Sequence, residues 1–224
     1  MEWAVIFDWD GVILDSSQAH ERSWELIAEE KSLPLPKDHF ERSFGRKSDA
    51  IISEILKWSH DPFEIRSLTD RKEVLYREIV MREGIQALPG VEPWLRALQD
   101  HQVPCAVGSS TPHENIRCLS ALLGVEGFFT TIVAAEDVTR GKPDPDVFLQ
   151  AAARLGVNAE HCVVFEDAPA GIEAALAAGM LAVGVAGTHG VDGLSRAHTV
   201  VQRMDELTPQ QVKGWLKERT AANG

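Results

Sequence analysis

The chain opens with an apolar run that ends in two carboxylates. Trp3 to Phe7 are apolar, and Asp8, Asp10 and Gly11 follow directly. A short apolar run without alternation is typical of a parallel strand that is buried on both faces. Burying a carboxylate costs free energy unless a cation or hydrogen bonds compensate, and ligands of open α/β sheets bind beyond the carboxyl ends of strands. We therefore expect this carboxylate pair to hold a cation or to perform chemistry.

From residue 89 onward, short apolar runs alternate with helical patterns. This alternation predicts an α/β fold with a doubly wound, parallel, Rossmann-like sheet. The further strands are expected at 103–108, 131–135, 162–166 and 181–186, and the helices at 112–123, 145–155 and 169–178.

The region between the first strand and this alternation has a different pattern. It predicts helices at 18–31, 47–58 and 62–83, without any strand signal. The breaks between these helices contain Pro34, Pro36 and Asp61–Pro62, which are typical helix terminators and starters. We expect an α/β core domain at 1–15 and 88–224, with an α-helical cap domain at 16–87 inserted in it.

Helix boundaries in the core carry recognisable end signals. Thr111 to Glu114 predicts a capping box, with the Thr111 hydroxyl as the N-cap and Pro112 at the first helical position. Gly124 and Gly156 fall where left-handed C-terminal caps would end their helices. These signals set boundaries and contribute little to the driving force for folding.

Charge and cysteine content narrow the class of partner. The 224-residue chain has 22 Lys and Arg against 34 Asp and Glu, a formal net charge of -12, which argues against nucleic acid and anionic membrane surfaces. No apolar stretch is long enough to cross a bilayer, and the Met1–Trp3 start lacks the basic segment of a signal peptide. Three cysteines without CxxC spacing fit a reducing compartment. We expect a cytoplasmic protein, a monomer or weak dimer, with a small phosphorylated substrate and no nucleic acid or membrane partner.

Polar residues follow three of the expected strands, and a lysine precedes one helix. Ser109 follows the apolar run 104–108, Glu166 and Asp167 follow 162–165, and Lys142 lies in the turn before the helix at 145. Because the carboxyl ends of parallel strands meet at one edge, these groups should converge with the carboxylates after the first strand. Carboxylates, a hydroxyl and an ammonium together suit phosphoryl transfer, where positioning and charge neutralisation provide most of the catalysis.

A mechanism follows from these residue types. Asp8 would attack phosphorus and form an aspartyl phosphate, while Asp10 would protonate the leaving oxygen and then deprotonate the acceptor. Mg²⁺ would bridge Asp8, Asp167 and the substrate, because a carboxylate is otherwise repelled by a phosphate dianion. Lys142 would neutralise the transferring group, and the Ser109 hydroxyl would bind its oxygens.

In this order along the chain, the motifs resemble those of the haloacid dehalogenase superfamily, in the branch that contains β-phosphoglucomutases and sugar-phosphate phosphatases. The resemblance implies that Asp8 is the nucleophile, that Asp10 is the acid/base, and that residues 16–86 close over the substrate as a cap. True haloacid dehalogenases lack an acid at the position of Asp10, so carbon–halogen cleavage is disfavoured. The matching residues are Asp8-Trp9-Asp10-Gly11-Val12, Ser109, Gly141-Lys142-Pro143-Asp144 and Glu166-Asp167-Ala168-Pro169-Ala170-Gly171.

The same resemblance implies how ligands are held. Mg²⁺ would be bound by Asp8, the Asp10 carbonyl and Asp167, with Glu166 assisting. The phosphate would be bound by the residues that match the family's phosphate loop and lysine, which are Ser109, Ser110 and Lys142.

The helical segment resembles β-phosphoglucomutase at three positions. The pattern implies that His20 links the hinge to the acid/base, that Arg46 holds a second phosphate and that Lys72 contacts the sugar. The alternative is that His20 caps its helix and that Arg46 and Lys72 are solvated. The loop Ser109 to Pro112 resembles the phosphatase version rather than the mutase version, which has a Lys-Asn pair, for which Asn115 is the nearest match.

Three hypotheses remain open from the sequence. The first is a Mg²⁺-dependent phosphatase of a small phosphorylated metabolite, in particular a sugar phosphate. The second is a β-phosphoglucomutase-like isomerase that converts glucose 1-phosphate to glucose 6-phosphate. The third is a non-catalytic phosphoacceptor switch, which Asp10 and the helical insertion disfavour.

Overall fold

The fold is described from a computed structural model that covers residues 2–43, 46–187 and 191–222. The chain forms two compact units. Residues 1–15 and 87–224 form the sheet unit, and residues 16–86 form the helical unit. Ala87 belongs to the sheet unit because it pairs with Leu14 in an antiparallel bridge.

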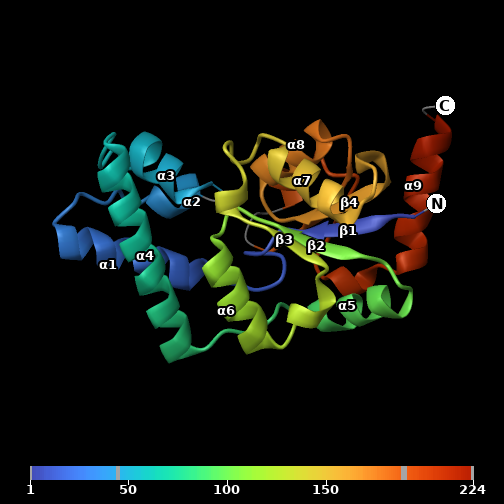
Figure 1. The fold of residues 1–224 in the computed structure, drawn as a ribbon, viewed down its shortest axis with the longest axis horizontal. Coiled ribbons are helices and arrows are strands. Elements are labelled where there is room, and N and C mark those ends of the chain that lie inside the picture. The colour runs from blue at the N-terminus through green and yellow to red at the C-terminus, as the bar shows by residue number, and fades with distance from the viewer. Residues whose placement is uncertain (1, 44–45, 188–190, 223–224) are drawn as a thin grey trace. The chain divides into compact units, whose positions relative to one another are not determined.

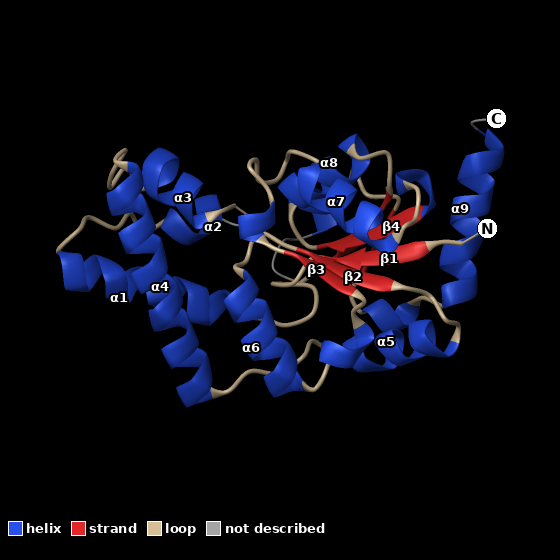
Figure 2. Ribbon diagram, in the orientation of Figure 1, coloured by secondary structure: helices blue, strands red, loops and turns tan. Residues whose placement is uncertain are grey.

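A six-stranded sheet in the order β3-β2-β1-β4-β5-β6 is the framework of the sheet unit, and Figure 2 shows its strands in red. Every pairing is parallel. The strands are β1 (Ala4–Phe7), β2 (Cys105–Gly108), β3 (Thr131–Val133), β4 (Cys162–Glu166), β5 (Leu181–Val185) and β6 (Thr199–Val201). The predicted doubly wound, parallel α/β fold is confirmed.

Helices cover both faces of this sheet, with α7 and α8 on one face and α5 on the other (Figure 1). The α-helices are α5 (Val91–Asp100), α6 (His113–Leu123), α7 (Asp146–Leu155), α8 (Pro169–Ala177) and α9 (Pro209–Ala222). Short 3-10 helices are η2 (Glu126–Phe128), η3 (Ala135–Asp137), η4 (Ala159–His161), η5 (Val191–Leu194) and η6 (Met204–Glu206).

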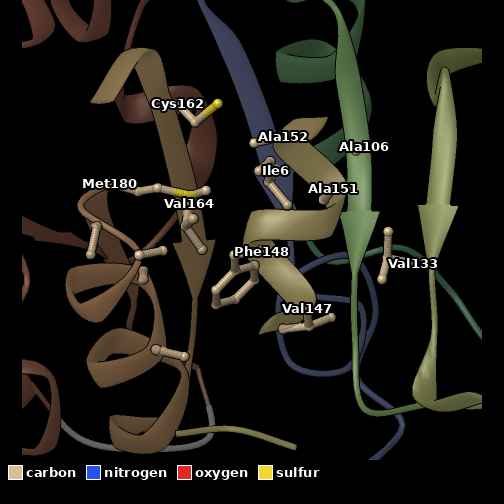
Figure 3. Close-up of a cluster of buried hydrophobic side chains, with 14 of the residues drawn as sticks. Ile6, Ala106, Val133, Val147, Phe148, Ala151, Ala152, Cys162, Val164 and Met180 are labelled. Atoms are coloured by element: carbon tan, nitrogen blue, oxygen red, sulfur yellow. The ribbon is translucent and has the colours of Figure 1, made fainter. Parts of the chain in front are cut away.

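A buried apolar cluster holds α7 and α8 against the sheet. Phe148 of α7 lies among Ile6 of β1, Ala106 of β2 and Val164 of β4, as Figure 3 shows. All four side chains are fully buried. Burial of a side chain such as Phe or Ile stabilises a fold by about 1.5–3 kcal/mol, so this cluster fixes the strands from which the polar residues project.

The helical unit has an apolar cluster of its own. Trp24 and Ile27 of α1 pack with Ile52, Leu68 and Leu75, all of which are buried. The helices are α1 (Ser17–Lys31), α2 (His39–Ser43), α3 (Ser48–Ala50), the π-helix η1 (Ile51–Ile55) and α4 (Pro62–Glu83). No helix of either unit, over the residues described, is long and apolar enough to cross a membrane.

One local prediction holds with a change of detail, and another is wrong. The expected helix at 47–58 forms over 48–55, but as α3 followed directly by the π-helix η1, where the Leu56 N–H donates to the Ile51 carbonyl at 2.9 Å, five residues back. The expected capping box at Thr111 does not form, because α6 begins at His113 and has no side-chain cap. The Thr111 hydroxyl instead donates to Asp10, as described below.

Candidate active site

The site is built where β1 ends between its two neighbours. Phe7 pairs with Val107 of β2 and with Phe165 of β4, so the residues that follow these three strands lie at one edge. The Asp8 N–H donates to the Phe165 carbonyl at 2.9 Å, which extends the pairing by one residue. This register brings Asp8 beside Glu166, although 158 positions separate them in the chain.

Lys142 lies between two of these carboxylates. Its Nζ is 2.9 Å from Asp8 Oδ1 and 2.7 Å from Glu166 Oε1. Lys142 Nζ also lies 4.8 Å from the centre of the Phe148 ring, over which it is placed. All three charged side chains are buried. The ammonium is thus fixed as a point charge beside the expected nucleophile, as predicted from the turn in which Lys142 lies.

Burial and charge act in opposite directions on these groups. Burial raises the pKa of Asp8 to about 7, with Lys142 opposing this change and the Glu166 carboxylate adding to it. For Lys142, burial lowers the pKa of the ammonium, but the carboxylates of Asp8 and Glu166 outweigh it and the net direction is upward. Lys142 is therefore a permanent cation.

Two glycines leave room for the carboxylates. A Cβ atom on Gly11 would lie 1.9 Å from Asp167 Oδ2, and one on Gly171 would lie 1.7 Å from Glu166 Oε1. Gly11 also has a φ of +76°, which other residues rarely adopt. The glycines that follow each acidic pair therefore shape the site, because any larger residue would displace a carboxylate.

Three carboxylates of the site fit a divalent cation. Asp8, Glu166 and Asp167 each offer an oxygen within 4.8 Å of the others, and all three are buried. The Lys142 ammonium contacts two of these three groups, so the group as a whole carries more acidic than basic side chains away from water. Hard cations such as Mg²⁺ prefer carboxylate oxygens, and a bound cation would offset this excess.

Asp10 takes a separate position from this group. Its Oδ2 accepts a hydrogen bond from the Thr111 hydroxyl, and the side chain is half-buried. Thr111 is itself buried. The side-chain carboxylate of Asp10 is thus held by the loop after β2. The metal role that the resemblance implies for Asp10 concerns its backbone carbonyl and not this carboxylate.

The loop after β2 carries both predicted serines. The buried Ser109 extends the β2–β3 pairing, since its N–H donates to the Val133 carbonyl at 3.0 Å. Its Oγ accepts from the Thr111 N–H at 3.2 Å. Ser110 lies between them and is half-buried. Asn115, the nearest match to the mutase pair, is buried in α6.

In the helical unit, His20 and Lys72 contact each other. Lys72 Nζ donates to His20 Nδ1 at 2.8 Å and to Glu73 Oε1 at 3.1 Å. The His20 ring stacks on Tyr76 with centroids 4.1 Å apart. The Ser48 hydroxyl donates to the same Glu73 oxygen at 3.0 Å. Lys72 is buried, so the alternative that it is merely solvated is wrong for this residue.

Arg46 lies apart from this cluster. Its Nη2 atom is 3.2 Å from Glu54 of η1; the Arg46 side chain is partly exposed and that of Glu54 is largely exposed. An exposed ion pair of this kind contributes little to stability, so Arg46 can exchange this partner for another anion.

The comparison with protein families gives the chain its class. The model of haloacid dehalogenase-like hydrolases matches residues 4–179. The chain belongs to the haloacid dehalogenase-like hydrolase family. The resemblance seen in the sequence is confirmed, and so is the prediction of an enzyme, because the similar proteins named below are phosphatases and phosphomutases.

Relatives and solved structures of this hydrolase family agree with that assignment. A 5-amino-6-(5-phospho-D-ribitylamino)uracil phosphatase from Arabidopsis thaliana is 37% identical over 91% of the chain, which spans 55% of that relative's length. A β-phosphoglucomutase from Bacillus subtilis is 35% identical over 92% of the chain and 91% of the relative. The structure of a β-phosphoglucomutase from Clostridium difficile superposes with a TM-score of 0.87 at 27% identity, over 99% of this chain and 100% of the other.

Within this family fold, the geometry brings together most of the residues singled out from the sequence. It also adds residues that sequence reasoning missed. Thr111 was interpreted only as a helix cap, and Glu73 was not singled out. The motif glycines Gly11 and Gly171 were quoted without a reason. Gly171 makes room for Glu166, five positions before it, whereas Gly11 makes room for Asp167 of a distant motif, so no local sequence signal marks the reason for Gly11.

Proposed function

We propose that the chain is a Mg²⁺-dependent phosphatase of a small phosphorylated metabolite with a polyhydroxylated carbon chain, and that it acts through an aspartyl phosphate on Asp8. The observation that carries this proposal is the Lys142 ammonium, 2.9 Å from Asp8 and 2.7 Å from Glu166 at the edge where three strands end. A fixed cation beside a carboxylate suits attack on a dianionic phosphate.

The first half of the reaction transfers the phosphoryl group to the enzyme. An Asp8 oxygen attacks phosphorus while the bond from phosphorus to the alcohol oxygen breaks. Asp10 gives its proton to the departing oxygen, and Lys142 stabilises the charge on the transferring group. The Ser109 hydroxyl and Ser110 hold the phosphate oxygens in this account.

The second half returns the enzyme to its starting state. Asp10, now a carboxylate, takes a proton from water as the water oxygen attacks phosphorus, and the bond from phosphorus to Asp8 breaks. Inorganic phosphate leaves and Asp10 is again protonated. The same residue therefore acts as acid and then as base.

The buried carboxylates support Mg²⁺ as the cofactor. Asp8, Asp167 and Glu166 would hold it, together with the Asp10 carbonyl. A bound Mg²⁺ supplies charge neutralisation for the incoming phosphate. Glu166 has a second task in this account, because its contact with Lys142 fixes the ammonium.

In this proposal the helical unit determines which substrate is accepted. We assign it the role of a cap, in which Lys72 and His20 contact the hydroxylated part of the substrate and Arg46 contacts any second phosphate. The named substrates of the relatives, a phosphoribityl compound and phosphoglucose, both carry phosphate on a hydroxylated chain. Action in the cytoplasm, as a monomer or weak dimer, stays a prediction.

One observation favours a second candidate, a β-phosphoglucomutase activity. Proteins of that name match the chain over nearly its whole length in sequence and in structure. In that reaction the aspartyl phosphate would be returned to a sugar hydroxyl before water attacks.

One assay separates the two candidates. Purified protein is incubated with Mg²⁺ and a panel of glucose 6-phosphate, fructose 1-phosphate, ribitol 5-phosphate and glycerol 3-phosphate, and released phosphate is measured. Multiple turnover with at least one compound is expected. Conversion of β-glucose 1-phosphate to glucose 6-phosphate with little free phosphate, dependent on a bisphosphate primer, would favour the mutase. Failure to release phosphate from any compound of the panel would contradict the phosphatase.

A further inference from the structure

Thr111 is committed to Asp10 by its side chain. Its side chain is buried, and its hydroxyl donates to Oδ2 of Asp10 across 101 positions of sequence. The helix that follows has no side-chain cap, although Thr111 stands where an N-cap hydroxyl is expected. A helix cap of this kind is worth about 0.5–2 kcal/mol, so a hydroxyl placed elsewhere indicates another use.

The backbone of Thr111 is anchored on both sides. Its N–H donates to Ser109 Oγ at 3.2 Å, and its carbonyl accepts from the Ala135 N–H at 3.2 Å. The first bond ties Thr111 to the end of β2, and the second ties it to η3 at the end of β3. The position of the hydroxyl is therefore set by the sheet.

His113, two residues further on, strengthens this anchor. The His113 N–H donates to Glu136 at 3.1 Å, and His113 Nε2 donates to Asp137 at 2.6 Å. Asp137 also accepts from Arg154 of α7 at 2.7 Å. The loop that carries Thr111 is thus joined to η3 and α7 by several polar contacts, which restrict how far the hydroxyl can move away from Asp10.

We propose that Thr111 is a positioning residue that holds the Asp10 carboxyl group in the orientation needed for proton transfer. The inference rests on the proposed function, because Asp10 has this task only in a phosphoryl-transfer reaction. A hydroxyl has one hydrogen, and Thr111 gives it to Oδ2. The carboxyl group of Asp10, held in this way, delivers its proton to the leaving alcohol oxygen as the bond from phosphorus to that oxygen breaks.

A merely structural role and this role differ in how they depend on the leaving group. A sugar alkoxide is strongly basic and needs a proton as it departs, whereas 4-nitrophenolate departs without one. The ratio kcat/KM reports the transfer to Asp8, because release of the alcohol completes that half of the reaction. Misorienting Asp10 should therefore affect a sugar phosphate and spare 4-nitrophenyl phosphate.

The test compares Thr111→Val with Thr111→Ser, using the best sugar phosphate of the panel and 4-nitrophenyl phosphate. Valine keeps the shape and removes the hydroxyl, and serine keeps the hydroxyl. We expect Thr111→Val to lower kcat/KM for the sugar phosphate about 10- to 100-fold, part of the about 10²–10⁴ that a general acid supplies. For 4-nitrophenyl phosphate the loss should stay below about threefold, and serine should restore both values to within about threefold of the wild type.

Thr199→Val is the matched control, because it removes a hydroxyl from β6, at the opposite end of the sheet from the β2–β3 edge. It should leave both kcat/KM values and their ratio unchanged. Equal losses of Thr111→Val on both substrates, or no loss on either, would overturn the positioning role while the wild-type phosphatase activity stands. A wild type that hydrolyses no panel compound would instead overturn the proposed function.

Discussion

Each of the two units contains a buried lysine, and the two lysines differ in the charges around them. Lys142 in the sheet unit contacts Asp8 at 2.9 Å and Glu166 at 2.7 Å, and Asp167 belongs to the same group of carboxylates. Lys72 in the helical unit contacts one carboxylate, Glu73, at 3.1 Å, with the imidazole of His20 at 2.8 Å.

The difference in charge separates the tasks of the two clusters. Around Lys142, carboxylates outnumber the ammonium three to one, and such an excess in a buried site favours binding of a further cation. Around Lys72, among the residues that the structure describes, the ammonium contacts the single carboxylate of Glu73, and the aromatic rings of Trp24 and Tyr76 lie 5.2 and 5.4 Å from Nζ. That cluster needs no metal, which suits a group that contacts a neutral, hydroxylated part of a substrate.

The largest effect is expected from removing the nucleophile. Asp8→Asn keeps the size of the side chain and removes the charge that attacks phosphorus. Phosphate release from every compound of the panel should fall to background, while the circular dichroism spectrum stays that of the wild type. Turnover by this variant comparable to that of the wild type would contradict covalent catalysis.

The stabilisation of the fold by Mg²⁺ should distinguish the cluster around Lys142 from the cluster around Lys72, without any measurement of activity. At a Mg²⁺ concentration about 100 times its Kd, the free energy of unfolding should rise by about 2.7 kcal/mol, and a chelator should reverse the gain. Asp167→Asn should abolish most of this gain. The control Glu126→Gln, at an exposed position in η2, should keep it. An equal gain in Asp167→Asn and in the control would place the cation elsewhere.

The raised pKa of Asp8 predicts how stability depends on pH in the metal-free protein. Burial raises this pKa from the ordinary 3.8 to about 7, so the folded state binds a proton that the unfolded state has already released. The stability of the wild type relative to Asp8→Asn should therefore decrease as the pH rises from about 4 to about 7, and then level off. Urea unfolding of both proteins in chelator measures this difference. A difference that grows with pH would contradict the desolvation of Asp8.

The smallest effect is expected in the helical unit. Lys72→Met keeps the length of the side chain and removes its charge, and should lower kcat/KM for the best sugar phosphate about tenfold, the value of one hydrogen bond to a charged group. Stabilisation by Mg²⁺ should not change. Lys37→Met, at an exposed position of the same unit, is the control. A loss of Mg²⁺ stabilisation in Lys72→Met would remove the distinction between the two clusters.

Much of the sheet unit could be predicted because its chemistry follows its strands. Apolar runs that end in Asp8, Ser109 or Glu166 report both the strand and the edge at which polar groups meet. The sequence signal was weaker where an element is short or lies at an edge. The three-residue edge strand β6 and the helices α5 and α9 were not predicted.

Other features could not be derived from local sequence, because long-range contacts decide them. The segment Thr111 to Glu114 has the sequence of a capping box, yet the Thr111 hydroxyl donates its hydrogen bond to Asp10 instead. A glutamate within a helix is usually solvated, yet Glu73 is buried and accepts hydrogen bonds from Lys72 and Ser48. The π-helical turn at Ile51–Ile55 leaves no pattern in the sequence that differs from an α-helix.

Trapping the covalent intermediate tests the central claim most directly. The wild type is mixed with Mg²⁺ and its best sugar phosphate, quenched in acid within one turnover, digested and analysed by mass spectrometry. The account predicts one added phosphoryl group on the peptide that contains Asp8, which is lost in chelator and never formed by Asp8→Asn. A peptide that stays unmodified during active turnover, or a phosphoryl group on any other residue, would contradict it.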